Sequence, residues 1–512
     1  MDSLSALVDL LDNTDKKLFR NFLQQKNKRY DVKNLRLLNL IETDDINGIN
    51  KLYKSSKNKD AYHALRKRLQ DNLLVFLSQK TFERNQSGAY EALRLLVVGR
   101  YLLENDLPLI AFKNLAKAER LAESLEQFNM LNELLLLKMQ YAHVPGAEHL
   151  DVLTARFMQN QSAMQREAKL NMAYAFLRQE LQQIHLKGKV VNLSSLMISV
   201  VRKYKISRQD LLTFKSIYQI LFIANEYAAI QQNYRLIARY IARTDEFIQK
   251  QSLAKHSYLF YHIGILYFMA NFYLRTGDFV KSTAGLDKMA ALMKMDERHQ
   301  AQYYHRQQLL VALNCFFAGD AAGAITVLQG ALAIKKQAAK PEDVEDLRIC
   351  LAMVLAMCNK RESVKQLMLL ARTDAWHEKQ LGMLWTIRKT LMEILIQAQF
   401  SNIELAMARI SSFRRRYKKY LLKTREDKVL LFLKLVEQHL LKPDLIFDFK
   451  YRAKVLSLLN EPESNDIFTL SFIAWLIARW EKNTPHELVL KLMRNADANQ
   501  FKIRYPGNGK LT

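Results

Sequence analysis

The densest group of chemically capable side chains lies between residues 409 and 423. Seven cations and one interleaved tyrosine fall in a single expected helix: Arg409, Arg414, Arg415, Arg416, Tyr417, Lys418, Lys419 and Lys423. Cations on one helix face can contact successive phosphates, and a tyrosine can stack on an unpaired base. The run therefore predicts binding to nucleic acid or another polyanion. The alternative is a solvated helix, because three consecutive arginines wrap most of the way round it and their aliphatic stems cover neighbouring residues.

The sequence holds no pattern typical of an enzyme active site. The histidine pairs His256/His262 and His299/His305 are six residues apart, whereas a helical metal site usually has i, i+4 spacing. No Gly-x-Ser-x-Gly turn occurs, and the glycine-rich segment 506–511 lacks the hydroxyl residue that follows lysine in a phosphate loop. We therefore expect a protein without enzymatic activity, metal or cofactor.

Composition predicts a helical protein without a membrane span. Hydrophobic residues make up 49% of the chain and charged residues 25%, with only 14 glycines and 7 prolines to interrupt helices. The longest uncharged stretch, residues 258–274, is shorter than the roughly 20 apolar residues that a span needs. The first residues lack the features of a secretory signal, so we expect a cytoplasmic protein. Three cysteines within apolar helical patterns indicate reduced thiols: Cys315, Cys350 and Cys358.

The net charge of +26 is the extreme value of the composition. It favours contact with an acidic partner, such as nucleic acid, an anionic membrane surface or an acidic protein. The alternative is that the charge serves only solubility.

Turns at a regular interval separate the elements that must position these residues. From about residue 89 onward, turn signals recur roughly every 42 residues: Asn105-Asp106, Pro145-Gly146, Gly188, Asn233, Gly277-Asp278, Gly319-Asp320, Asn359-Lys360, Ser401-Asn402, Pro443-Asp444 and Thr484-Pro485. Each interval accommodates two helices, and a single helical hairpin is too thin to bury its own apolar face. The sequence therefore predicts an all-α fold, an α-solenoid of about ten stacked helical hairpins.

The N-terminal part of the chain differs from the rest. Helical patterns run over residues 15–26, 32–42 and 60–84, which indicates a separate helical cap or bundle over residues 1–88. The solenoid then covers residues 89–500, and residues 501–512 form a C-terminal tail. At the clearest turn, Gly277 supplies backbone freedom and Asp278 can cap the helix that follows.

Three of the hairpins share small and apolar residues at corresponding positions. They are residues 99–118 with Asp106, Ala111 and Leu115, residues 270–284 with Tyr273 and Gly277-Asp278-Phe279, and residues 312–331 with Gly319-Asp320, Ala324 and Leu328. Small residues let paired helices approach closely, and a large apolar residue fills the space beside them. These units resemble tetratricopeptide repeats. The interval exceeds the roughly 34 residues of the standard repeat, so each helix must be about a turn longer.

The resemblance implies a binding groove. In tetratricopeptide proteins the first helix of each pair usually lines the groove, which places four residues on the inner wall: Arg100, Tyr267, Asn271 and Arg306. Such side chains would clamp an extended or helical peptide through its backbone and acidic groups. The alternative is ordinary packing between repeats, particularly for Tyr267.

Three functions remain open at this point. The first is a non-enzymatic scaffold or adaptor that binds a protein or peptide partner through an acidic or extended segment. The second is an RNA- or DNA-associated factor that uses a basic solenoid surface. The third is a regulator that changes its superhelix pitch on binding a small peptide or ligand, which rests on analogy with repeat proteins alone.

Overall fold

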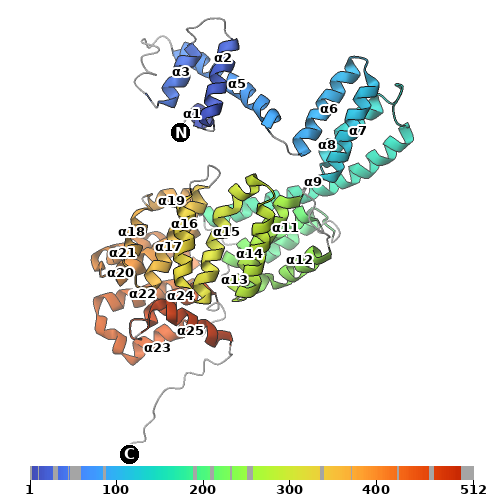
Figure 1. The fold of residues 1–512 in the computed structure, drawn as a ribbon. Coiled ribbons are helices and arrows are strands. Elements are labelled where there is room, and N and C mark those ends of the chain that lie inside the picture. The colour runs from blue at the N-terminus through green and yellow to red at the C-terminus, as the bar shows by residue number, and fades with distance from the viewer. Residues whose placement is uncertain are drawn as a thin grey trace, which may run out of the picture. The chain divides into compact units, whose positions relative to one another are not determined.

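The computed structural model describes most of the chain (Figure 1). The described residues are 3–9, 11–26, 33–43, 45, 59–84, 88–187, 193–207, 213–230, 233–250, 258–334, 340–370, 372–423, 426–459, 466–481 and 483–497. The expected turn at Gly188 and the expected tail, residues 501–512, lie outside them. By its contacts the chain divides into unit 1, residues 1–164, and unit 2, residues 165–512, and each is described here by itself.

All regular elements of the described residues are helices, as the sequence predicts. Unit 1 contains α1 (Ser3–Asp9), α2 (Asn13–Lys26), α3 (Lys33–Glu42), α5 (Lys59–Arg84), α6 (Gly88–Glu104), α7 (Pro108–Ser124), α8 (Phe128–Gln140) and the first part of α9 (Leu150–Lys187). Unit 2 begins with the rest of α9, followed by α10 (Leu193–Lys203), α11 (Phe214–Ile230), η3 (Tyr234–Ile237), α12 (Ala238–Lys250), α13 (Leu259–Arg275), α14 (Phe279–Met293), α15 (Glu297–Ala318) and α16 (Ala321–Ala333). It continues with α17 (Pro341–Met357), α18 (Glu362–Met368), α19 (Asp374–Leu381), α20 (Met383–Gln399), α21 (Ile403–Lys423), α22 (Asp427–Leu441), η5 (Pro443–Phe447), α23 (Phe449–Ser457), α24 (Ile467–Ile477) and α25 (Pro485–Asp497).

Unit 1 holds two separate apolar cores. Helices α1, α2, α3 and α5 share a core that includes Leu4, Phe19, Leu37 and Leu69. Helices α6 to α9 enclose another, centred on Leu115. Helices α2, α3 and α5 agree with the three predicted N-terminal helices within two residues at each end. The predicted division of the chain into domains 1–88, 89–500 and 501–512 stays a prediction.

Five of the ten predicted turns share one backbone structure. At five joints the residue after the first helix has a φ between 57° and 106°: Asp106, Gly277, Gly319, Asn359 and Ser401. The next N–H then bonds a carbonyl five residues earlier, as Asp278 does to Tyr273 at 2.9 Å and Lys360 to Leu355 at 2.8 Å. This pattern is a Schellman-type helix end, which satisfies carbonyls that the helix leaves unpaired. The four joints of unit 2 lie about 41 residues apart, close to the predicted interval.

Capping and small residues fix the helix pairs at these joints. The carboxylate of Asp278 accepts a hydrogen bond from the N–H of Lys281 at 3.1 Å, which confirms the predicted cap. Helices α6 and α7 approach so closely that a Cβ atom on Gly99 would lie 2.6 Å from a methyl carbon of Leu115. The small residues of the tetratricopeptide-like units therefore allow close helix packing.

Adjacent helix pairs of unit 2 share an extended apolar core, and further buried apolar clusters lie elsewhere in this unit. The pairs α13/α14, α15/α16, α17/α18 and α20/α21 follow one another along the chain, and each packs against the next (Figure 1). Their core extends from Leu259 to Leu492. The arrangement is that of an all-α repeat. The stacking of about ten hairpins into a solenoid stays a prediction.

Helix α24 crosses the C-terminal ends of the first helices in four of these pairs. Asp466, directly before α24, forms an ion pair of 2.7 Å with Arg275 at the end of α13. Further along, Phe468 meets Phe317 near the end of α15, with ring centroids 5.7 Å apart. The indole of Trp475 donates to the Gln399 side chain at the end of α20, at 2.9 Å. We call these contacts, with those to α17 described next, the α24 seam.

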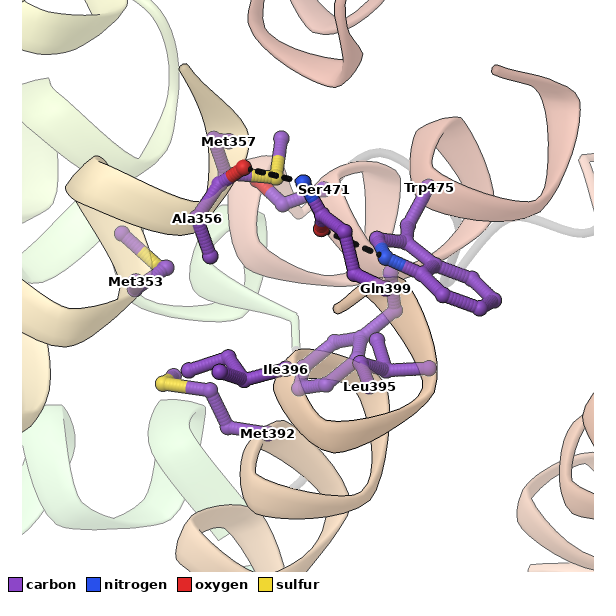
Figure 2. A pocket seen from close by; sticks show the side chains of 10 residues that line it. Met353, Ala356, Met357, Met392, Leu395, Ile396, Gln399, Ser471 and Trp475 are labelled. Carbon is purple, nitrogen blue, oxygen red and sulfur yellow. Dashed lines mark hydrogen bonds between the residues drawn. The ribbon is translucent and has the colours of Figure 1, made fainter. Parts of the chain in front are cut away.

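A small apolar hollow lies in the α24 seam (Figure 2). It has about 340 Å³ of empty space, part of it open to solvent, between α17, α20 and α24. Its lining is Met353, Ala356, Met357, Met392, Leu395, Ile396, Gln399, Ser471, Phe472 and Trp475. Gln399 also donates to the backbone carbonyl of Ala356 at 2.7 Å, so one amide ties α17, α20 and α24 together. The hollow is thus a gap in a tightly joined region.

No helix in the described part of the chain is both long enough and apolar enough to cross a membrane.

Candidate functional site

The same first helices carry polar side chains in the turns that precede the α24 seam. We call this group the central polar cluster: Tyr267 and Asn271 on α13, Arg306 on α15, Asp343 and Asp346 on α17, and Trp385 and Arg388 on α20. Except for Asp343, which is buried, and Arg388, which is exposed, its members are half-buried. Two contacts join members of the cluster directly, and Asn271 and Arg388 each bond α11.

An ion pair joins α15 to α17. The Nε atom of Arg306 donates to Oδ1 of Asp343 at 2.9 Å, and Asp343 is only 7% exposed. Burial alone would lower the pKa of Arg306, but the carboxylate of Asp343 overcomes it and raises that pKa. The pKa of the neighbouring Tyr267 hydroxyl is raised by burial. Arg306 therefore stays charged, and Tyr267 stays a neutral hydrogen-bonding group.

A second contact joins α17 to α20. The indole Nε1 of Trp385 donates to Oδ1 of Asp346 at 2.7 Å. Burial raises the pKa of Asp346 to about 6; the Trp385 hydrogen bond opposes this shift and the Asp343 carboxylate adds to it. Asp346 is therefore ionised at neutral pH only against an unfavourable environment.

Arg388 is the cation of the cluster without a carboxylate partner. Its guanidinium donates to the backbone carbonyl of Ala229 on α11 at 2.8 Å, and no carboxylate of the described residues lies within ion-pair distance. Desolvation by the surrounding helices, followed by repulsion from Arg275, lowers its pKa, although the more distant carboxylates of Asp466 and Glu226 oppose this shift. Its side chain is nevertheless exposed. An anion that reached this position would relieve both effects.

The structure brings three of the four predicted groove residues together. Asn271 donates to the Asn225 side-chain oxygen at 3.0 Å and to the Tyr234 hydroxyl at 3.5 Å. It joins Tyr267 and Arg306 in the central polar cluster. Arg100 belongs to unit 1, where it forms an exposed ion pair with Glu133 between α6 and α8. The role of all four in partner binding stays a prediction.

Helix α21 divides the predicted polyanion-binding residues into two sets. Three arginines have carboxylate partners on other helices: Arg409 pairs with Asp374 and Glu393, Arg414 with Glu437, and Arg416 with Glu378. Tyr417 is 2% exposed and its hydroxyl donates to Glu378. These four residues fasten α21 to α19, α20 and α22, and the ring of Tyr417 is not exposed for stacking.

The other set faces solvent. We call it the outer basic row: Arg415, Lys418, Lys419 and Lys423. None of these four has a hydrogen bond or ion pair to a described residue. The predicted cluster is thus half structural and half available for binding.

Four members of the central polar cluster were not singled out from the sequence. They are Asp343, Asp346, Trp385 and Arg388. Each polar pair has three-residue spacing at the start of an apolar helix, which places its members on one face. Acidic residues are also common in the first turn of any helix, so this signal does not separate a site from an ordinary helix start.

The chain matches no protein-family model, no curated protein and no solved structure. The likeness to tetratricopeptide repeats rests on the residues and joints described above.

Proposed function

We propose that the protein is a non-enzymatic scaffold or adaptor whose central polar cluster binds an extended, acidic segment of a partner protein. The observation that carries the proposal is the exposed Arg388 on α20, which has no carboxylate partner among the described residues, together with Asp346 on α17, whose pKa is raised by burial. Groups that are electrostatically unfavourable in the free protein are typical of binding sites, because a ligand supplies the missing partner.

The chemistry of the cluster suits an extended chain. Arg388 offers guanidinium N–H groups to a carboxylate. The side-chain oxygen of Asn271 and the hydroxyl of Tyr267 have no hydrogen bond to a described residue, so both can bond backbone groups of a partner. A helix-repeat surface recognises such a segment by main-chain bonds and by a few charged anchors.

Affinity purification from cell extract with matched variants tests this function. Arg388→Gln removes the exposed cation of the cluster, whereas Arg120→Gln removes an exposed arginine of α7 that likewise donates only to a backbone carbonyl. We expect the wild type and Arg120→Gln to retain the same protein partner after nuclease treatment, and Arg388→Gln to lose it. Equal retention by both variants would show that the cluster is not the binding site. Loss of every partner on nuclease treatment would contradict the scaffold itself.

A further inference from the structure

The outer basic row is a second candidate for binding, separate from the central polar cluster. We propose that it binds the phosphate backbone of duplex nucleic acid without reading base sequence. The first argument is spacing. Arg415, Lys418, Lys419 and Lys423 follow one another at intervals of three, one and four residues, which at about 100° per residue places all four within an arc of about 140° on the solvent side of α21.

The length of the row fits a phosphate strand. Eight residues of helix between Arg415 and Lys423 span about 12 Å. One strand of a duplex carries a phosphate about every 3.4 Å of its axis, so this length faces about three or four phosphates. Four cations on one helix face can therefore neutralise one short stretch of one strand.

Three carboxylates on helices that pack against α21 are already engaged. Glu378, Glu393 and Glu437 pair with the inward arginines of α21. The helix itself has no acidic residue after Glu404. Glu404 precedes Arg415 by about 16 Å along the axis, which exceeds the screening length of about 8 Å at physiological salt. The positive potential of the row is thus left uncompensated by its own helix.

Among residues 409–423 no aromatic ring is fully exposed, since Tyr417 is buried and Tyr420 is half-buried, and this favours a duplex over a single strand. Proteins that bind single strands stack bases on aromatic side chains. In this part of α21 Tyr417 is buried and bonded to Glu378. A row of cations alone contacts phosphates and leaves the bases unread.

Salt dependence gives the expected magnitude. Each neutralised phosphate contributes about −0.9 to the slope of log K against log salt concentration. Four contacts predict a slope of about −3.6, which lowers the affinity about 100-fold between about 50 and about 200 mM salt. The dissociation constant should lie in the range of non-specific binding, about 10⁻⁴ to 10⁻⁶ M at physiological salt.

Fluorescence anisotropy of the full chain with a labelled duplex DNA of about 20 base pairs tests the proposal. The row variant combines Arg415→Gln, Lys418→Gln, Lys419→Gln and Lys423→Gln. A control with the same net charge changes four exposed, scattered lysines, each without a described partner: Lys113→Gln, Lys169→Gln, Lys294→Gln and Lys491→Gln. We expect the row variant to lose at least about 50-fold in affinity at about 50 mM salt and most of its salt slope, and the control to lose far less.

Three outcomes would overturn the proposal. Equal losses of affinity in the row variant and the control would show that binding depends on net charge and not on the row. An affinity that does not change with salt would exclude phosphate contacts. Binding to anionic vesicles but not to duplex would assign the row to a membrane surface. The Arg388→Gln variant should bind duplex as the wild type does, so the two proposals fail independently.

Discussion

Two regions of the same four helices differ in how they are completed. At their C-terminal ends α13, α15, α17 and α20 meet the α24 seam, where apolar side chains and an internal ion pair close the surface. A few turns earlier the same helices carry the central polar cluster, where Arg388 is exposed without a carboxylate partner among the described residues. The charges of the seam are thus paired within the chain, whereas the cluster keeps one cation without a carboxylate partner among the described residues.

The difference distinguishes charges that are paired within the chain from the residues that we propose for binding. Charges in the α24 seam neutralise each other: Arg275 pairs with Asp466 and lies between the rings of Tyr234 and Phe468. In the central polar cluster, Arg388 and Asp346 retain unfavourable environments. Substitutions in the seam should therefore lower stability. Substitutions of Arg388 or Asp346 should leave stability unchanged or raise it while they reduce binding.

The largest effect is expected at the seam. Arg275→Ala removes the partner of Asp466, which is 5% exposed, and should lower the free energy of unfolding of unit 2 by about 3–5 kcal/mol. Urea unfolding followed by tryptophan fluorescence measures it, because all four tryptophans lie in unit 2. The double variant Arg275→Met with Asp466→Asn should lose clearly less. Equal losses in the single and double variants would show that charge pairing is not what holds the seam.

A smaller loss is expected where the cluster contains its own ion pair. Arg306→Ala leaves the buried Asp343 without its cation and should destabilise unit 2 by about 2–3 kcal/mol. The same unfolding measurement applies, with Lys294→Ala as an exposed control that should change stability by less than about 0.5 kcal/mol. A loss of stability as small as that of the control would show that the ion pair between Arg306 and Asp343 does not stabilise unit 2.

Asp346→Asn should raise stability, with a defined pH dependence. The folded-state pKa of Asp346 is raised to about 6, from an ordinary value of 3.8, so the folded protein holds a proton that the unfolded chain releases in that window. This stabilisation is complete below the ordinary pKa and is lost as pH rises through about 6. Asparagine can still accept the Trp385 hydrogen bond and carries no charge.

The variant and wild type should therefore be equally stable near pH 4, and the variant should be more stable by on the order of 2 kcal/mol near pH 7.5. Urea unfolding at the two pH values measures the difference. A variant that is less stable at both would show that the carboxylate is structural.

The smallest effect is expected at the joint beside the seam. Gly277 follows Arg275 by two residues, has a φ of 85°, and a Cβ atom there would have no neighbour within 4 Å. Gly277→Val should lower stability by about 1 kcal/mol, from backbone strain alone. Thermal unfolding measures this loss, with Gly330→Val as the comparison. Gly330 has equally open surroundings but no positive φ, so the difference between the two variants gives the cost of the backbone strain. Identical losses of stability in both variants would show that the positive φ of Gly277 does not cause the loss.

The local structure could be predicted from the sequence because it depends on residues that are close in the chain. Helical periodicity located α2, α3 and α5, and glycine or asparagine located the joints at Gly277, Gly319 and Asn359. Both signals come from backbone preferences that act within a few residues.

The contacts between residues far apart in the chain could not be predicted from the sequence. The Nε2–H group of His486 donates a hydrogen bond at 2.7 Å to the carbonyl of Phe316, 170 residues away, and no local pattern encodes such a pairing. The basic run shows the same limit. Arg414, Arg415 and Arg416 are consecutive, yet Arg414 and Arg416 pair with Glu437 and Glu378 from other helices, and Arg415 has no side-chain partner among the described residues. Orientation depends on which helices pack around α21, which periodicity alone does not specify.

Site-specific photo-crosslinking tests the central claim most directly. A p-azidophenylalanine placed at Tyr267 keeps the aromatic shape within the central polar cluster, and the same group at the exposed Tyr101 of unit 1 serves as the control. We expect illumination in cell extract to yield a nuclease-resistant protein adduct at position 267. Arg388→Gln should abolish this adduct, and position 101 should not give it. An adduct at position 267 that is unaffected by Arg388→Gln, or the same adduct at both positions, would contradict the central claim.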